Sequence, residues 1–355
     1  MLPQSSFNIT KVLNVVALAT LSMVTHASIY ALNFMIFPDL APDLDISGLE
    51  FGILAGVGLT VSFIPFLIPL GMYVDTWDKR TLILGGLLLK LFFGALQSIA
   101  WDFWSLLVIR IGLGLGFASS FAPCISIVSQ LDYGSDIGIG LSYSVLATGP
   151  YLGIGLASWA AVLSYLYGWQ TTFGLFGFVC GLEAFVIILL VPQDKGGERM
   201  WASEERLLAV WFTQSTHALL TAAGSFSTFS WLATAAYFPI YFQRFVVSDA
   251  SAVPAISLWV GGVLLFAGCL SVPTGSLATQ LLLQRTRIHG APAFVAAAAS
   301  LIAVPLLLLA LFAPFATWLV LVLLFLAYFF SQAWIGPAVF MTQVRRTVIA
   351  GGFSP

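Results

Sequence analysis

Charge is scarce in this sequence, and the scarcity excludes an ordinary soluble domain. Asp, Glu, Lys and Arg make up 8% of the 355 residues, whereas 60% of the residues are hydrophobic. A soluble domain usually carries about 25% charged residues. The composition therefore predicts an integral membrane protein.

Cysteine and histidine are also rare, with three of each in the whole chain. Cys124, Cys180 and Cys269 lie within apolar segments, so free thiols are expected rather than a disulfide framework. The sequence has no His/Cys cluster with metal-ligand spacing, no glycine-rich loop after a strand pattern and no nucleophile–base pair. We expect neither an enzyme nor a resident cofactor, and no nucleic-acid partner.

Long apolar runs make up most of what is present. A helix that crosses a bilayer needs about 20 apolar residues, whereas a membrane barrel is built from short alternating strands. Ten spanning helices are predicted, at residues 12–37, 49–74, 81–100, 104–129, 138–164, 168–192, 215–242, 254–282, 291–312 and 315–342. A polar loop at 193–214 separates a six-helix half, 1–192, from a four-helix half, 215–355. The predicted fold is an all-α, polytopic membrane protein.

A charged turn joins the second and third predicted spans. It begins at Gly71, carries the acids Asp75 and Asp78, and ends with the cations Lys79 and Arg80. Positive charge in short loops stays on the cytoplasmic side of a membrane. The turn is therefore predicted to be cytoplasmic, which also places the N-terminus in the cytoplasm.

The remaining cations agree with this topology. Of the thirteen Lys and Arg residues, ten fall in segments predicted to be cytoplasmic and only Arg244 falls in an outer loop. The other two, Lys90 and Arg110, lie inside spans. Such a bias predicts a multi-pass protein with a cytoplasmic N-terminus.

Arg110 lies in the fourth span, about 13 Å below the outer surface at 1.5 Å per residue. A guanidinium at that depth is costly unless it faces water, an anion or a partner group. We expect it to face a central cavity and contact the substrate; the alternative is a structural arginine held by backbone carbonyls. His26 and Tyr30 in the first span are weaker substrate-contact candidates, since a lone histidine in a helix is more often a hydrogen-bonded packing residue than a pH switch.

Lys90 and Glu183 are the other ionisable residues deep in spans. Counted from the cytoplasmic face, Lys90 is about 15 Å deep and Glu183 about 13.5 Å deep. Because charges inside membranes tend to be paired, an ion pair between them is predicted. A structural clamp is the preferred role, with a proton relay as the alternative.

The seventh span is rich in aromatic and hydroxyl side chains, among them Phe229, Trp231 and Tyr237. Such a surface suits an amphiphilic substrate, with rings for its apolar chain and hydroxyls for its head group. Interfacial anchoring and helix packing are the alternative explanation.

The turn from Gly71 to Arg80 has the spacing G-x-x-x-D-x-x-D-K-R, which resembles the loop between the second and third helices of major facilitator superfamily transporters. Gly149 and Pro150 in the fifth span resemble a second element of that superfamily, where proline bends the helix. Segments 37–40, 110–123, 226–241 and 334–343 are most similar to the Spinster-like lipid transporters. The resemblance implies a monomeric transporter whose cytoplasmic gate contains Asp75, Lys79 and Arg80.

Two positions depart from the Spinster-like pattern. The chain has Ile29–Tyr30 where that family commonly has an Asp-Arg pair, and Phe117 where it commonly has a glutamate. Two acids that could carry protons are therefore missing.

The second half has four predicted spans where the resemblance implies six, so we expect the chain to be truncated at its C-terminus. Two functions stay open. One is alternating-access transport of a small organic or amphiphilic, lipid-like solute across the bilayer. The other is a non-transporting membrane protein, such as a sensor, an interaction partner or a degenerate paralogue.

Overall fold

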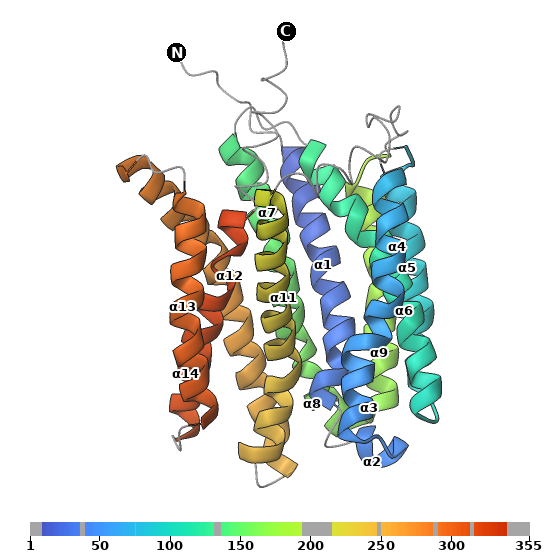
Figure 1. Cartoon of the computed structure of the whole chain (residues 1–355). Helices are drawn as coiled ribbons and strands as arrows, with labels where there is room; N and C mark the ends of the chain where they lie inside the picture. The colour runs from blue at the N-terminus through green and yellow to red at the C-terminus, as the bar shows by residue number, and fades with distance from the viewer. Residues whose placement is uncertain are drawn as a thin grey trace. The chain divides into compact units, whose positions relative to one another are not determined.

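The computed structural model describes residues 9–35, 40–74, 76–130, 136–193, 215–246, 250–286, 290–312 and 316–338. Every regular element in these ranges is helical (Figure 1). The first group of elements is α1 (Ile9–Met35), α2 (Ala41–Leu44), α3 (Gly48–Gly52), the π-helical turn η2 (Ile53–Val57), α4 (Gly58–Tyr73), α5 (Lys79–Leu96), the 3-10 turn η3 (Gln97–Ile99), α6 (Phe103–Gln130), α7 (Asp136–Ala157), α8 (Trp159–Tyr167) and α9 (Trp169–Leu190). The second group is α11 (Ser215–Tyr241), η4 (Phe242–Val246), η5 (Ala250–Ala252), α12 (Val253–Thr286), α13 (Ala291–Phe312) and α14 (Thr317–Gln332).

Nine helical stretches in the described part of the chain are long and apolar enough to cross a membrane. Some of them combine elements: α3, η2 and α4 form one continuous stretch, α5 continues into η3, and α7 continues into α8 through a turn at Ser158. The hydroxyl-rich α11 is not among the nine, although its 27 residues are long enough to span a bilayer. The prediction of an all-helical membrane protein with about ten spans is confirmed.

The exposed surface of these helices is apolar, as lipid contact requires. Leu189 on α9 and Phe312 on α13 are each 81% exposed. Tryptophans are exposed near helix ends, including Trp101, Trp104 and Trp318. Amphipathic indole rings are enriched at membrane–water interfaces. The surface therefore matches a multi-pass membrane protein.

Two compact units make up the chain. Unit 1 comprises Met1–Met200 and Ala236–Gly262, and unit 2 comprises Trp201–Ala235 and Val263–Pro355. The end of α11 and the beginning of α12 therefore pack with the first six spans, although the sequence places them in the second half.

Small residues bring the helices of unit 1 close together. α1 packs on α7 and α9, while α6 packs on α4 and α5 (Figure 1). A Cβ added to Gly149 of α7 would lie 2.6 Å from the carbonyl oxygen of Ala19. One added to Gly94 of α5 would lie 2.9 Å from Cα of Gly177 on α9. Backbones approach this closely only where side chains are small, which is the usual interface of membrane helices. α7 continues through Pro150, the residue after Gly149.

Unit 2 uses the same kind of contact. A Cβ on Gly275 of α12 would lie 2.1 Å from the carbonyl oxygen of Ala333, and one on Gly336 would lie 2.1 Å from Ser276 Oγ. α13 and α14 pack along each other. Trp231 of α11 donates a hydrogen bond from Nε1 to the hydroxyl of Tyr328 on α14.

Gly153→Val should destabilise unit 1. Its Cβ would lie 2.4 Å from the carbonyl oxygen of Met23 and 3.0 Å from the amide nitrogen of Ala27, both on α1. Backbone atoms cannot rotate away, so α1 must shift, and overpacking of this kind costs about 1–3 kcal/mol. The melting temperature of detergent-solubilised protein should fall. Gly174→Ala is the matched control, because a Cβ there meets no atom within 4 Å among the described residues. Equal melting temperatures for both variants would contradict the packing argument.

Candidate functional site

An aromatic cluster joins three helices of unit 1, and we define it by His26, Tyr30, Phe63, Phe117 and Phe121. Phe117 of α6 stacks on Phe63 of α4, with ring centroids 4.6 Å apart. It also meets the edge of His26 of α1 at 5.4 Å and that of Phe121 at 5.7 Å. Tyr30 stacks on His26 at 6.3 Å. Phe121 is 38% exposed, so the cluster is buried at its α1 side and open at its α6 side.

His26 is fixed by its own helix. Its Nδ1 lies 2.7 Å from the carbonyl oxygen of Ser22. A carbonyl only accepts hydrogen bonds, so Nδ1 carries the hydrogen in this contact. The backbone of Gly153 packs beside His26, since a Cβ there would lie 2.7 Å from His26 Cβ. The two first-span candidates, His26 and Tyr30, are thus brought together, and His26 is held in place by Ser22 and Gly153.

Arg110 is fully buried at the junction of α1, α6 and the turns beside them. Its Nε donates to the carbonyl oxygen of Leu54 at 2.8 Å, and its Nη2 donates to that of Ile29 at 3.1 Å. The third nitrogen, Nη1, lies 3.4 Å from Oε1 of the buried Gln97. The structure therefore favours a structural role for Arg110, held largely by backbone carbonyls, over a guanidinium that faces an open cavity and contacts the substrate.

Two of these acceptors come from irregular turns. Leu54 belongs to η2, and Gln97 begins η3, where α5 tightens at its end. A π-helical turn offsets the regular i to i−4 pattern and leaves the carbonyl group of Leu54 for another donor, whereas Gln97 accepts through its side chain and Ile29 lies in α1. A substrate could reach the Arg110 guanidinium only by exchanging with these hydrogen bonds.

Lys90 and Glu183 occupy the same interior but do not form the predicted direct ion pair. The buried ammonium of Lys90 donates to Thr25 Oγ1 at 2.6 Å and to Ser120 Oγ at 2.9 Å. Oε1 of Glu183 accepts from Thr20 Oγ1 at 2.9 Å. The opposite charges interact electrostatically. Hydroxyl groups of α1 and α6 take the place of direct contact.

The charged turn is described in part, because Asp75 lies outside the described residues. Asp78 caps α5: its Oδ2 accepts from the backbone nitrogen of Thr81 at 3.2 Å. Lys79 is buried, with 1% of its surface exposed. The Nε atom of Arg80 is buried and has no hydrogen-bond partner among the described residues. Gly71 is exposed, and a Cβ there would meet no atom within 4 Å in the described part of the chain.

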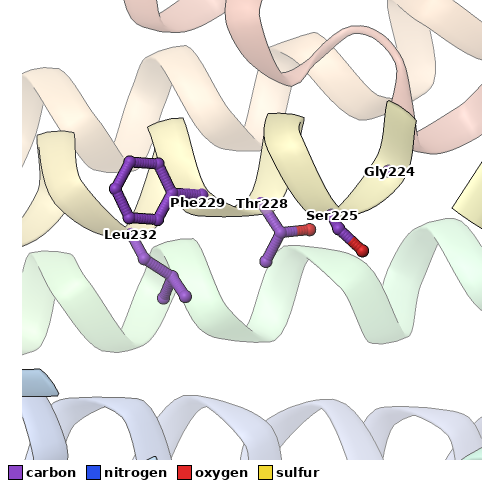
Figure 2. Close-up of a pocket in the computed structure, with 5 residues that line it drawn as sticks. All are labelled: Gly224, Ser225, Thr228, Phe229 and Leu232. Carbon is purple, nitrogen blue, oxygen red and sulfur yellow. The ribbon is translucent and has the colours of Figure 1, made fainter. Parts of the chain in front are cut away.

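The three aromatic candidates of the seventh span fall into different environments. Phe229 lines a cavity of about 470 Å³ together with Gly224, Ser225, Thr228 and Leu232 (Figure 2). Figure 2 shows Ser225, Thr228 and Leu232 projecting from one side of α11. Trp231 is bonded to Tyr328 instead, and Tyr237 meets the edge of Phe51 at 5.9 Å. The three side chains therefore have different surroundings.

A group of contacts joins the beginning of α12 and the end of α11 to the first six spans within unit 1. Gln243 Nε2 donates to the carbonyl oxygen of Phe34 at 3.0 Å and lies 3.3 Å from Ser257 Oγ. A Cβ on Gly261 of α12 would lie 2.2 Å from Cβ of Ser158, at the junction of α7 and α8. We call the contacts of Gln243 and Gly261 the latch.

Sequence reasoning missed several of these residues. Phe63 and Phe121 of the aromatic cluster were not singled out, although the spacing of Phe117 and Phe121, four residues apart, places both rings on one face of a helix. Gln97, Thr25 and Ser120 were missed as well. They carry no signal of their own, because a buried hydroxyl or amide is defined by the neighbours it meets.

A comparison with family profiles gives a match to the Major Facilitator Superfamily over residues 18–350. The chain belongs to this superfamily. It is 24% identical over 162 residues to the 3-(3-hydroxy-phenyl)propionate transporter of Escherichia coli K12. It is 26% identical over 149 residues to a probable sugar efflux transporter of Helicobacter acinonychis. These matches cover 45% and 39% of the chain, and 40% and 37% of the relatives' own lengths.

Solved structures of the superfamily share the fold. A bacterial homologue of the human lysosomal transporter Spinster, in an inward-facing and unoccupied conformation, superimposes with a TM-score of 0.69 at 16% identity. That comparison covers 96% of this chain and 78% of the other. A point mutant of the nucleoside transporter NupG gives a TM-score of 0.68 at 14% identity, covering 96% of this chain and 85% of the other. The predicted major facilitator fold is therefore confirmed, and Spinster-like structures are among its neighbours.

Proposed function

We propose that this superfamily member is a secondary transporter that moves a small organic or amphiphilic, lipid-like solute across a membrane by alternating access. Its N-terminus is cytoplasmic, and it acts as a monomer. Membership of the superfamily and the relatives named as transporters support the transport function. The positive-inside bias of the loops supports the orientation.

The aromatic cluster carries the proposal for the solute. Its five rings come from α1, α4 and α6, and among their side chains only His26 and Tyr30 bring polar atoms. Aromatic pairs contribute about 0.5–1.5 kcal/mol beyond the area they bury. A solute with a flat or apolar body and a small polar head group fits such a surface. The cavity along α11, with Phe229 beside Ser225 and Thr228, offers the same mixture of ring and hydroxyl.

In this proposal the residues of the charged turn control the cytoplasmic gate. Asp78 caps the beginning of α5, and Asp75 precedes it by three residues in the sequence. Gly71, at the beginning of the turn, adds no side chain there. Gly149 lets α7 approach α1, and Pro150 allows that helix to bend.

Uptake into proteoliposomes tests the proposal. Labelled lysolipid, 3-(3-hydroxyphenyl)propionate and a nucleoside are offered to the purified full chain. Phe117→Ala should reduce uptake of the preferred probe strongly, because it removes the central ring of the aromatic cluster. Phe178→Ala is the matched control, since Phe178 is 57% exposed on α9.

Equal uptake by the two phenylalanine variants would remove the aromatic cluster from the site. Saturable binding of a probe without any uptake would instead favour the non-transporting alternative, a sensor or interaction partner. Uptake of the nucleoside alone would overturn the lipid-like solute while leaving transport in place.

A further inference from the structure

Glu183 has an unusual position among the acids of this chain. Fourteen of the fifteen Asp and Glu residues lie in loops or near the ends of predicted spans, and only Glu183 lies deep inside one. Its side chain is 6% exposed on α9. The apolar core around this level includes Ala17, Leu21 and Ile187. An ionisable group at this depth is costly to keep and usually has a function.

The hydroxyl of Thr20 is shared between two acceptors. Its Oγ1 lies 2.8 Å from the carbonyl oxygen of Ala17 and 2.9 Å from Oε1 of Glu183. A hydroxyl has one hydrogen to donate and also accepts. When that hydrogen points to Ala17, the Thr20 oxygen faces Glu183 with a lone pair, and only a protonated carboxyl can complete the contact. When it points to Glu183, Oε1 accepts it, which stabilises the ionised carboxylate most strongly.

The neighbouring cation is arranged to tolerate both states. Lys90 donates to Thr25 and Ser120, and Ser120 in turn lies 3.1 Å from the carbonyl oxygen of Gly116, so its hydrogen can point away from the ammonium. Lys90 therefore keeps its hydrogen-bond partners whether or not Glu183 is charged. In a direct ion pair, by contrast, protonation of Glu183 would remove the charged partner of Lys90.

Few other titratable groups face this interior. Cys124 of α6 and Cys180 of α9 interact electrostatically with both Lys90 and Glu183, and His26 of α1 interacts with Lys90. α1 faces Glu183 itself through the hydroxyl of Thr20. Protonation makes a carboxylate neutral, whereas it makes a histidine or a lysine a buried charge.

We propose that Glu183 is a proton-binding site of this protein, and that the Thr20 hydroxyl switches its hydrogen between Ala17 and Glu183 as the proton arrives and leaves. In the step, the carboxylate and one proton from the aqueous phase form the neutral carboxylic acid. The Lys90 and Glu183 side chains together pass from zero net charge to one positive charge. Use of this proton for coupling rests on the proposed transport function; the proton-binding site itself does not.

Infrared difference spectroscopy of the full chain in lipid nanodiscs, titrated from acidic to alkaline pH, tests the site. Since all fifteen Asp and Glu residues contribute protonated C=O bands, the spectrum of Glu183→Gln is subtracted from that of the wild type, and the difference should contain the C=O band of one protonated carboxyl that is lost as the pH rises. Glu183→Gln should lack this band. Thr20→Val should keep it at a higher frequency, because one hydrogen bond to the group is gone. Glu50→Gln is the matched control and should leave the band unchanged, since Glu50 is engaged in an exposed N-terminal cap with Ser47.

A band that is the same in the wild type and in Glu183→Gln would overturn the proposal. So would a Glu183 that stays ionised, or stays protonated, at every pH tested. If Glu183→Gln folds poorly, the frequency change in Thr20→Val decides the question, and no change there counts against the site. A titrating Glu183 band in a protein that takes up no probe would sustain the proton site and overturn the transport function instead.

Discussion

Arg110→Met should unfold a large part of unit 1 rather than weaken binding of a solute. The substitution removes the donors to Leu54, Ile29 and Gln97 in a fully buried region. A hydrogen bond to a charged group contributes about 1.5–3 kcal/mol, so the summed loss approaches the whole stability of a typical domain, about 5–15 kcal/mol. The melting temperature in detergent should drop steeply, with loss of monodisperse protein.

Two variants make this result specific. Arg110→Lys keeps the charge but loses the planar fork of donors, so its stability should fall between those of the wild type and Arg110→Met. Arg285→Met, at an exposed position near the end of α12, is the matched control and should melt like the wild type. If Arg110→Met melts normally but no longer binds a probe, Arg110 is a substrate contact after all.

The depth of Arg110 could be predicted from the sequence, but its surroundings could not. Counting residues from Trp101 places it well inside a span, and the structure has it buried on α6. Two of its three acceptors belong to a π-helical turn at Ile53–Val57 and a 3-10 turn at Gln97–Ile99. Ile53–Val57 is an apolar run and Gln97–Ile99 is Gln-Ser-Ile at the end of a predicted span, and neither pattern distinguishes such a turn from regular α-helix.

For Lys90 and Glu183 too, the depth could be predicted from the sequence but the hydrogen-bond partners could not. Equal depth predicted a shared interior, because the rise per residue is fixed in a helix. The direction of each side chain around its helix axis is set by packing, and here it brings in Thr20, Thr25 and Ser120 from α1 and α6. Spacing along one helix carries no information about hydroxyls on another.

The aromatic residues of the seventh span show that the sequence does not predict contacts between helices. The sequence marks α11 as rich in rings, and periodicity can group Ser225, Thr228, Phe229 and Leu232 on one face. It does not show that Trp231 bonds to Tyr328 or that Tyr237 packs on Phe51. Those contacts need the arrangement of several helices, which hydrophobic patterning leaves open.

The latch depends on Gly261, which the sequence alone does not distinguish from the neighbouring Gly262. Gly261 and Gly262 are adjacent on α12. A Cβ on Gly261 would lie 2.2 Å from Cβ of Ser158, whereas one on Gly262 would meet no atom within 4 Å among the described residues. The first glycine is therefore required for close packing at the α7–α8 junction, and the second is not.

Gly261→Leu should open the latch, while Gly262→Leu should leave it closed. Overpacking at Gly261 costs about 1–3 kcal/mol, and each 1.4 kcal/mol changes an equilibrium about tenfold. Hydrogen exchange in residues 253–262 should therefore become roughly ten-fold to a hundred-fold faster in Gly261→Leu. Since the Gln243 hydrogen bonds to Phe34 and Ser257 belong to the latch, Gln243→Leu should change exchange in the same direction.

The two leucine variants add the same side chain to the same helix, one position apart, so differences in helix propensity or hydrophobicity cancel between them. If the beginning of α12 must separate from the α7–α8 junction during transport, Gly261→Leu should also reduce net uptake of a probe by holding the latch open. Equal exchange rates in the two variants would show that the contact between Gly261 and Ser158 does not hold the latch closed.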